Sequence, residues 1–271
     1  MARPPRRPRY LRRVLPEERL SAVEHLEELR NRIIVSLVAL VVAFIGMYLI
    51  QDQLIDVLAH PLDADRRDDL LTLSPTEPFF TILKICFYAS LLVALPIWLY
   101  QLYAFVIPAV QEQPRRVMLA IVAGVSGLFA AGVAFGYFVV LPVALDFLLG
   151  FGEGTFDTQL RAGEYFGFAT TLLLGAGLLF EVPVAMLALA RIGVVTAAQF
   201  RRNWRIAIVV IAVVAAVLPG GDPFSMFLLM LPQIVLYQVG IWLAGVFGGP
   251  PLWQRERWTA GGEGGGEGGV A

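Results

Sequence analysis

The chain alternates between long apolar runs and shorter polar connections. A helix that crosses the hydrocarbon core of a bilayer needs about 20 mainly apolar residues, each rising about 1.5 Å. The pattern therefore predicts an all-α polytopic membrane protein with six transmembrane helices. They lie at about 33–50, 79–106, 117–148, 165–192, 206–218 and 224–247. The fifth helix is short, because a run of its length spans about 20 Å against a core of about 30 Å.

The polar segments divide the rest of the chain. Residues 51–78 form a polar, mostly acidic loop, and a basic loop follows the fourth run. Three regions result. Residues 1–20 are predicted to be a disordered basic arm, residues 21–247 a single six-helix membrane domain, and residues 248–271 a flexible tail, since the run GGEGGGEGG is typical of a linker.

Lys and Arg are distributed unequally between the two sides of this domain. Cytoplasmic loops of membrane proteins carry the excess of positive charge. If the N-terminus is cytoplasmic, that side holds 17 Lys and Arg residues and the opposite side holds three. The pattern therefore predicts that both termini are cytoplasmic. The carboxylates between Glu24 and Glu28 are an exception, because they lie on the basic side.

Composition narrows the possible functions. The chain of 271 residues is 58% hydrophobic and 16% charged, with a mean hydropathy of +0.70, whereas soluble domains average about 25% charged residues. A net charge of −1 gives no case for nucleic-acid binding. Cys86 is the single cysteine, which excludes an internal disulfide. The sequence has no phosphate-binding glycine loop and no metal motif. We therefore expect neither an enzyme nor a bound cofactor.

The stretch SAVEHLEELRNR leads into the first apolar run. Its spacings fit a capping box (Ser21 with Glu24) and two ion pairs (Glu28 with Arg32, and Glu27 with Arg30). Each such pair supports a helix by about 0.3–0.5 kcal/mol. Two interpretations remain open. The stretch is either a capped and salt-bridged start of a membrane helix, or part of a surface that recognises a cationic peptide.

Glu181 lies in the middle of the fourth apolar run. An ionisable side chain at that depth is costly, so Glu181 is a candidate functional residue. The alternative is a protonated or locally hydrogen-bonded carboxyl group that faces the bundle. Pro183 follows two residues later and predicts a kink, because proline removes a backbone donor.

The sequence GVSG at 124–127 matches the G-x-S-G of rhomboid-type intramembrane serine proteases. Such a serine needs a histidine base within hydrogen-bond reach. The two histidines, His25 and His60, both lie outside the apolar runs. We therefore reject a protease, and we expect these small residues, like Gly132 and Gly136, to permit close helix packing.

An ion-coupled small-solute secondary transporter is the second hypothesis. Four prolines interrupt apolar runs, namely Pro96, Pro142, Pro183 and Pro232. Broken helices occur in transporters built from repeats, but the two halves of this chain show no self-similarity. In this alternative Glu181 and Asp222 would couple the ion.

Five ordered motifs between Leu20 and Phe247 resemble the TatC family, the receptor core of the twin-arginine protein translocase. They are HLEELRNR, SPTEPFFTILK, LPIWLYQLYAFVIPA, FEVPVA and PGGDPFS. The resemblance implies a six-helix, glove-shaped bundle in a prokaryotic cytoplasmic membrane. It also implies protein transport. In that family the cytoplasmic face captures signal peptides with paired arginines, and the resemblance implies that this chain does so too. It further implies partners of the single-span TatA and TatB type, self-association in a complex, and export of folded proteins driven by the proton-motive force.

The resemblance assigns roles to particular residues. It implies signal-peptide binding for Glu28, Arg30 and Phe105, intramembrane or partner contact for Glu181 and Asp222, and a structural role for Pro61. The chain departs from the family at two positions. Pro114 stands where a glutamate usually precedes two basic residues, so Glu112 is the candidate replacement. Met226 stands where the family often has a glutamine.

The chemistry of arginine explains why carboxylates matter in such a receptor. A guanidinium donates a planar fork of hydrogen bonds that a carboxylate accepts, and lysine cannot reproduce this geometry. A receptor that requires two arginines therefore needs two carboxylates. Glu28 is the first, and Glu112 or Glu27 is the candidate second. Exposed pairs contribute only about 0–1 kcal/mol. Affinity must therefore also come from an apolar part of the signal lying near Phe105 or against neighbouring copies.

Overall fold

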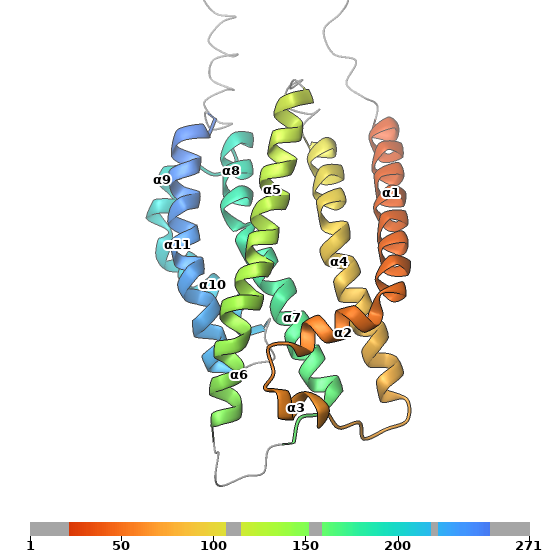
Figure 1. The fold of residues 1–271 in the computed structure, drawn as a ribbon. Coiled ribbons are helices and arrows are strands. Elements are labelled where there is room, and N and C mark those ends of the chain that lie inside the picture. The colour runs from red at the N-terminus through yellow and green to blue at the C-terminus, as the bar shows by residue number, and fades with distance from the viewer. Residues whose placement is uncertain (1–21, 107–114, 152–158, 218–221, 250–271) are drawn as a thin grey trace, which may run out of the picture.

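The computed structural model describes residues 22–106, 115–151, 159–217 and 222–249 (Figure 1). Within these ranges the chain is helical apart from short connections and an isolated parallel bridge between Leu71 and Arg161. Several predictions fall outside the described residues. They concern the arm at 1–20, the capping residue Ser21, the loop residues Glu112 and Pro114, and the tail beyond residue 249.

The helices follow one another in the order α1 (Ala22–Leu49), α2 (Gln51–Ala59), α3 (Ala64–Asp68), α4 (Glu77–Val106), α5 (Arg115–Phe135), α6 (Leu141–Gly150), α7 (Ala162–Phe180), α8 (Val182–Ile192), α9 (Ala197–Arg202), α10 (Trp204–Val217) and α11 (Pro223–Phe247). A π-helical turn, Gly136–Val140, joins α5 to α6. In Figure 1, α1 begins and α4 and α8 end at the top, which we call the upper face. The opposite end, with α2 and α3, is the lower face.

Five segments of the described chain are long and apolar enough to cross a membrane, so this is a multi-pass membrane protein. They are Leu26–Leu49, Glu77–Leu102, Val122–Gly150, Ala162–Ile192 and Pro223–Phe247. These segments confirm five of the six predicted spans. The remaining run forms α10, whose 14 residues extend for only about 21 Å.

Two segments that were predicted as loops contain helices. The polar segment 51–78 holds α2 and α3, and the basic segment after α8 holds α9. The buried Leu58 of α2 belongs to the main core. The hydroxyls of Tyr165 and Tyr137 donate hydrogen bonds to the carbonyls of Leu58 and Val57, at 2.6 and 2.8 Å. These partners lie far along the chain, so the local polar pattern could not reveal that α2 is helical.

The four prolines in the apolar runs have different effects. The helices α4 and α11 continue through Pro96 and Pro232. The π-helical turn ends just before Pro142. The helix breaks between α7 and α8 at Glu181, two residues before Pro183. The kink predicted at Pro183 is therefore confirmed. The prediction that Pro96 and Pro232 interrupt their helices is wrong.

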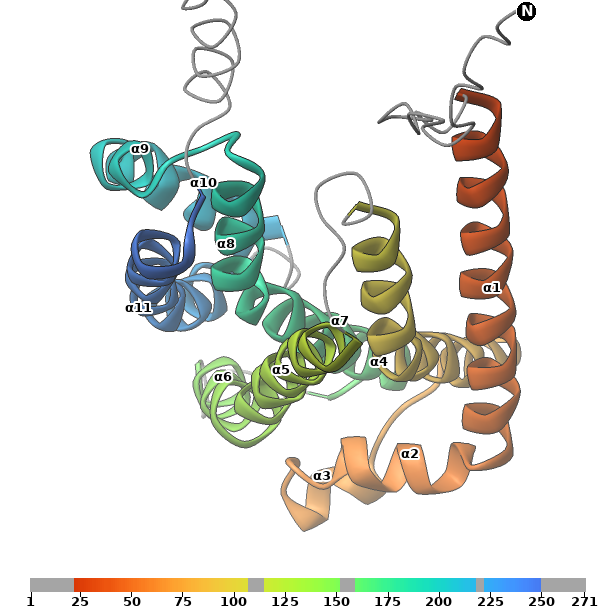
Figure 2. The same ribbon diagram turned by 90° about the horizontal axis from the view of Figure 1, so that it is seen from above.

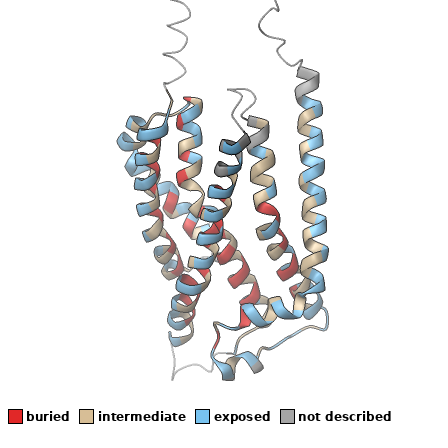
Figure 3. Ribbon diagram, turned by 45° about the horizontal axis from the view of Figure 1, so that its top comes forward, coloured by how far each residue is buried: buried red, intermediate tan, exposed pale blue. Residues whose placement is uncertain are grey.

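Buried side chains concentrate on α7 and on the helix surfaces that face it (Figure 3). A Cβ atom added to Gly132 would lie 2.8 Å from the carbonyl oxygen of Ala176, and one on Gly136 would lie 2.9 Å from the Ala176 Cβ. The close packing predicted at these two glycines is thus confirmed. The same test at Gly124 and Gly127 finds nothing within 4 Å. The prediction that Gly124 and Gly127 permit close helix packing is therefore wrong within this chain.

The first helix stands at the edge of the bundle and packs along α4 (Figure 2). No residue in its most apolar window is buried. The indole Nε1 of Trp98 on α4 donates a hydrogen bond to the Ser36 carbonyl of α1, at 2.9 Å. The acidic stretch that precedes the first apolar run is part of the same helix, because α1 begins at Ala22 and not near Ile33. The orientation of its carboxylates is therefore set by how α1 docks on α4.

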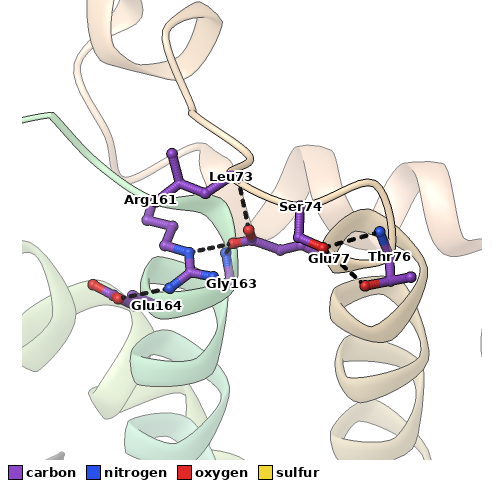
Figure 4. A network of polar contacts seen from close by, with 7 residues as sticks. All are labelled: Leu73, Ser74, Thr76, Glu77, Arg161, Gly163 and Glu164. Atoms are coloured by element: carbon purple, nitrogen blue, oxygen red, sulfur yellow. Dashed lines mark hydrogen bonds and ion pairs between the residues drawn. The ribbon is translucent and has the colours of Figure 1, made fainter.

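A polar network at the lower face joins the start of α4 to the start of α7 (Figure 4). The Glu77 carboxylate accepts hydrogen bonds from Arg161 Nε (2.8 Å) and from the backbone N–H groups of Leu73 (2.9 Å) and Gly163 (3.3 Å). Arg161 Nη1 also donates to Glu164, at 3.4 Å. The hydrogen bond to Glu77 raises the pKa of Arg161 above its ordinary value. We call these residues the lower-face network.

Candidate functional site

Two of the three predicted recognition residues on α1, Glu27 and Glu28, line a concavity between α1 and α4 at the upper face. Its volume is about 440 Å³ and it is open to the surroundings. Its lining comprises Glu27, Glu28, Asn31, Arg32 and Val35 of α1 and Gln101 of α4. Residues three and four apart share one side of a helix, so the spacing of these α1 residues places them all on the side that faces the concavity. The two carboxylates give this site its acidic character.

Glu28 is held by Arg32, one helical turn further along α1. Arg32 Nε donates to Glu28 Oε1 at 3.1 Å, and Arg32 Nη2 donates to the same oxygen. Arg32 Nη1 donates to Gln101 Oε1 on α4, at 3.2 Å. The side chains of Glu28 and Arg32 are 30% and 21% exposed. The predicted pair of Glu28 with Arg32 is confirmed, and Gln101 anchors it to the neighbouring helix.

Glu27 and Arg30 behave differently from their neighbours. Both side chains are exposed, and the part of the chain that the structure describes shows no ion pair between them. The pairing predicted from their spacing is therefore wrong. Arg30 does not line the concavity, whereas Glu27 does. Glu27 consequently lies beside Glu28 as a second carboxylate that no described cation neutralises.

Gln101 is the α4 residue that lines the concavity, and two aromatic residues share its side of the helix. Trp98, Gln101 and Phe105 are three and four residues apart, which places them on one side of the helix. Trp98 and Gln101 both contact α1. Phe105 is half-buried in the last turn of α4. The sequence reasoning selected Phe105 but missed Trp98 and Gln101, although their spacing in LPIWLYQLYAF carries that signal.

The other predicted residues lie away from this concavity. Pro61 is half-buried in the turn after α2, and Asp222 caps the start of α11. The Asp222 carboxylate accepts a hydrogen bond from the Ser225 backbone N–H at 2.7 Å. Asp222 thus has a structural role at a helix start, which the sequence reasoning did not assign. Glu112 lies outside the described residues, so its position beside Glu28 stays a prediction.

Glu181 occupies the break between α7 and α8. Its backbone carbonyl accepts a hydrogen bond from the Ala185 N–H at 2.9 Å. The side chain is half-buried, and its Oε1 atom is buried without a hydrogen-bond partner among the described residues. A buried polar atom that lacks a partner is destabilising by about 1–3 kcal/mol. Glu181 is therefore a candidate contact point for a polar group from outside the chain.

The chemistry available at the upper face is the binding of cations by carboxylates. Across the described ranges, no three His, Cys, Asp or Glu side chains are placed to hold a metal ion. The concavity instead presents Glu27 and Glu28 with one internal arginine already bound. Its geometry suits a guanidinium ligand better than a metal, because a carboxylate oxygen can accept charge-assisted hydrogen bonds from more than one donor.

Comparison with known proteins gives one consistent result. The family model described as Sec-independent protein translocase protein (TatC) matches residues 24–232. A chloroplastic Sec-independent protein translocase protein TATC of Arabidopsis thaliana is 39% identical over 236 residues, which cover 86% of this chain and 69% of the relative. The TatC protein of Deinococcus radiodurans is 36% identical over 240 residues, covering 86% and 89%.

Solved structures agree with the sequence comparisons. A crystal structure of a twin-arginine translocase receptor, TatC, superposes with a TM-score of 0.73 at 33% identity, covering 82% of this chain and 98% of that chain. A second crystal structure of the receptor, in the detergent DDM, gives a TM-score of 0.75 at 32% identity. The matched span contains both carboxylates of the concavity and Glu181.

Proposed function

The chain belongs to the TatC family of Sec-independent protein translocase proteins, and from this premise we propose that its upper face is a receptor for twin-arginine signal peptides. As a family member it is a component of a protein translocase and a membrane protein without enzymatic activity. The receptor surface in this proposal is the concavity between α1 and α4. A signal peptide docks there before the folded protein behind it is exported.

One observation carries the proposal. Arg32 engages a single oxygen of Glu28, and Oε2 of the same carboxylate accepts no hydrogen bond from any described residue. A carboxylate has about four acceptor positions on its two oxygens. Glu28 can therefore accept an incoming guanidinium at Oε2 while Arg32 keeps it oriented. This arrangement supports Glu28 as the acceptor for one of the paired arginines.

The second arginine requires another carboxylate nearby. Glu27 lines the same concavity, and Glu112 follows α4 in the sequence. Arg30 is exposed and does not line the concavity, so it leaves both carboxylates accessible to a ligand. The half-buried Phe105 offers an apolar surface for the segment that follows the arginines in the signal. Its contribution is needed, because exposed ion pairs alone are weak.

We place the upper face on the cytoplasmic side of a prokaryotic cytoplasmic membrane. The strong excess of Lys and Arg on that side supports this orientation. Both termini are then cytoplasmic. We also take α10 as the sixth span of a glove-shaped bundle. A helix of about 21 Å is shorter than the hydrocarbon core, so either the bilayer thins beside it or partner helices bind there.

We infer that single-span partners of the TatA and TatB type bind beside α10 and α11, and that further copies of this chain join the complex. The outer side of α10 exposes Val209, Val213 and Val217, which are four residues apart. A partner helix that packs there covers apolar surface beside this short helix. Glu181, with its unpartnered buried oxygen, can accept a hydrogen bond from a polar side chain of such a helix. Asp222 supports this surface by capping α11.

An export assay tests the receptor function. Cells that lack their own twin-arginine receptor would produce a reporter with a twin-arginine signal, together with either this chain or its Glu28→Gln form. We expect the unaltered chain to restore export and Glu28→Gln to restore much less. A reporter whose signal carries Lys-Lys serves as the control for arginine specificity. Full export with Glu28→Gln, at equal protein levels, contradicts the assignment of Glu28.

The ion-coupled transporter is set aside. The matched family and the matched structures are those of a protein translocase. The two carboxylates that the transporter hypothesis needed do not form a pair, since Asp222 caps α11 and Glu181 lies at the break between α7 and α8. No observation in the described chain favours a small-solute site.

A further inference from the structure

We propose that the groove enclosed by α8, α9, α10 and α11 binds one acyl chain of an anionic phospholipid, and that the arginines at the corner between α9 and α10 hold its phosphate headgroup. This site is separate from the concavity between α1 and α4. It requires neither the receptor function nor a particular orientation of the chain in the membrane.

The walls of the groove are apolar over most of their length. α10 contributes Ile206, Val210 and Val214, which are four residues apart and lie on one side of the helix, and α8 contributes Val182 and Met186. The groove therefore runs along the membrane-spanning part of the bundle. Such a surface is compatible with hydrocarbon and offers little to a polar ligand.

The size of the groove favours a thin occupant. Its volume is about 360 Å³. A helix is about 10–12 Å across with side chains, whereas α11 already contacts both α10 and α8 around the groove, which leaves no gap of that width between them. A partner helix can lie across the groove but cannot enter it. An acyl chain, one methylene wide, can.

The mouth of the groove is polar and flanked by positive charge. Gln199 and Asn203 line it at the level of α9. Beside them the exposed side chains of Arg201, Arg202 and Arg205 make no ion pair within the described part of the chain. Guanidinium groups bind phosphate oxygens through a planar fork of donors. An anionic headgroup at this position would neutralise charges that no acidic side chain of the described residues pairs with.

The corner is also built for a membrane interface. Trp204 is 45% exposed, and the guanidinium carbon of Arg205 lies 5.8 Å from the centre of its ring. Tryptophan is enriched at the level of lipid headgroups. The short α9 is fixed by a capping box between Thr196 and Gln199, and the Tyr237 hydroxyl donates to the Phe200 carbonyl at 2.9 Å. The arginines are thus presented from a fixed corner.

One buried polar side chain of the groove distinguishes a lipid from a protein ligand. Gln233 lines the groove, is 1% exposed, and has no hydrogen-bond partner for either amide atom among the described residues. A hydrocarbon chain gains nothing from this amide. A polar side chain on a partner helix would depend on it. Replacing Gln233 by leucine therefore separates the two occupants.

Lipid binding to the full-length chain, purified in a mild detergent, tests the proposal. The probes are phosphatidylglycerol and phosphatidylcholine with identical acyl chains, titrated and counted by native mass spectrometry. For the variant Arg201→Gln/Arg202→Gln/Arg205→Gln we expect phosphatidylglycerol affinity to fall at least about tenfold. Each arginine near an anionic headgroup strengthens binding of the lipid, and this variant removes three of them. Phosphatidylcholine binding should change little. The matched control, Arg30→Gln/Arg116→Gln, alters two exposed arginines of the upper face outside the groove and should bind as the unaltered chain does.

A second variant tests the groove itself. Val210→Trp fills the groove from a position that is 54% exposed, so the fold should tolerate it. We expect it to lose both lipids, and Gln233→Leu to keep the full preference for phosphatidylglycerol. Unchanged phosphatidylglycerol binding in the triple arginine variant or in Val210→Trp overturns the proposal. Loss of binding in Gln233→Leu, with the protein still folded by size-exclusion chromatography, overturns it as well.

Discussion

Arg32 donates two hydrogen bonds to one oxygen of Glu28, and no described residue donates to the other oxygen. The pair is thus compatible with both interpretations that the sequence left open. It supports the first turns of α1, since the residues are four apart, and it leaves the second oxygen able to accept a further hydrogen bond. Gln101 of α4 extends the pair across the helix interface.

The two carboxylates of the concavity should contribute unequally to signal-peptide binding. Glu28→Gln removes the charge that Arg32 orients, and charge-assisted hydrogen bonds contribute about 1.5–3 kcal/mol each. We expect roughly a tenfold or larger loss of affinity for a twin-arginine peptide. Glu27→Gln, which alters an exposed side chain, should cost about threefold or less. Titration by site-specific crosslinking or pull-down measures both. Equal affinities of the two variants contradict the assignment of Glu28.

The lower-face network should stabilise the fold without taking part in recognition. Glu77 is the centre of this network, and its side chain is only 8% exposed. Glu77→Gln removes the charge that faces Arg161 and weakens three hydrogen bonds, so the Tm in detergent should fall. Glu164→Gln is the matched control, because that side chain is 76% exposed and makes one 3.4 Å contact. Twin-arginine peptide binding should stay unchanged in both variants. An unchanged Tm for Glu77→Gln would contradict the prediction that this network stabilises the fold.

Two glycines of α5 should respond in opposite directions to the same substitution. Gly132→Ala places a methyl group 2.8 Å from a backbone oxygen of α7, and overpacking of this kind costs about 1–3 kcal/mol. Gly127→Ala meets no neighbouring atom and should stabilise the helix by up to about 1 kcal/mol. Thermal unfolding of both variants in the same detergent gives the comparison. Equal destabilisation of the two would mean that the α5–α7 contact is not as close as described.

The unpartnered oxygen of Glu181 should matter when partners bind. We expect Glu181→Ala to reduce copurification of a TatA or TatB type partner and to lower export of a twin-arginine reporter. Glu181→Gln keeps an acceptor at this position and should retain most of both activities. Normal copurification and export with Glu181→Ala would show that this side chain is not the contact point.

The sequence predicted what depends on local pattern. The five long spans, the short α10, the break before Pro183 and the pair of Glu28 with Arg32 all follow from spacing within one helix. Contacts between distant segments were not predictable in this way. The docking of Gln101 on Arg32 joins residues 69 apart, and Glu77 binds Arg161 across 84 positions. The motif SPTEPFF showed that Glu77 belongs to a family pattern, but it did not predict which residue the carboxylate would bind.

The missed helices have the same explanation. α2 is too short and too polar to be recognised from its own residues, and it is held by tyrosines of later segments. α9 has only six residues, but its capping box of Thr196 and Gln199 was readable in the sequence. The ion pair predicted between Glu27 and Arg30 is an error of the other kind, because a contact was predicted that the structure does not form. Correct spacing permits an ion pair, yet solvent competes with it when both side chains are exposed.

The peripheral position of α1 has a mechanical consequence. This helix meets the others mainly through α4 and has no buried residue in its most apolar window, so a change in its tilt would disturb the α1–α4 contact and leave the core around α7 intact. Its acidic tip is at the far end of a rod about 40 Å long, given 28 residues. A rotation of a few degrees at the base therefore displaces the tip by several ångströms. A lipid or a neighbouring protein that tilts α1 would therefore change the spacing of the carboxylates from α4 only by breaking the hydrogen bonds of Arg32 with Gln101 and of Trp98 with Ser36.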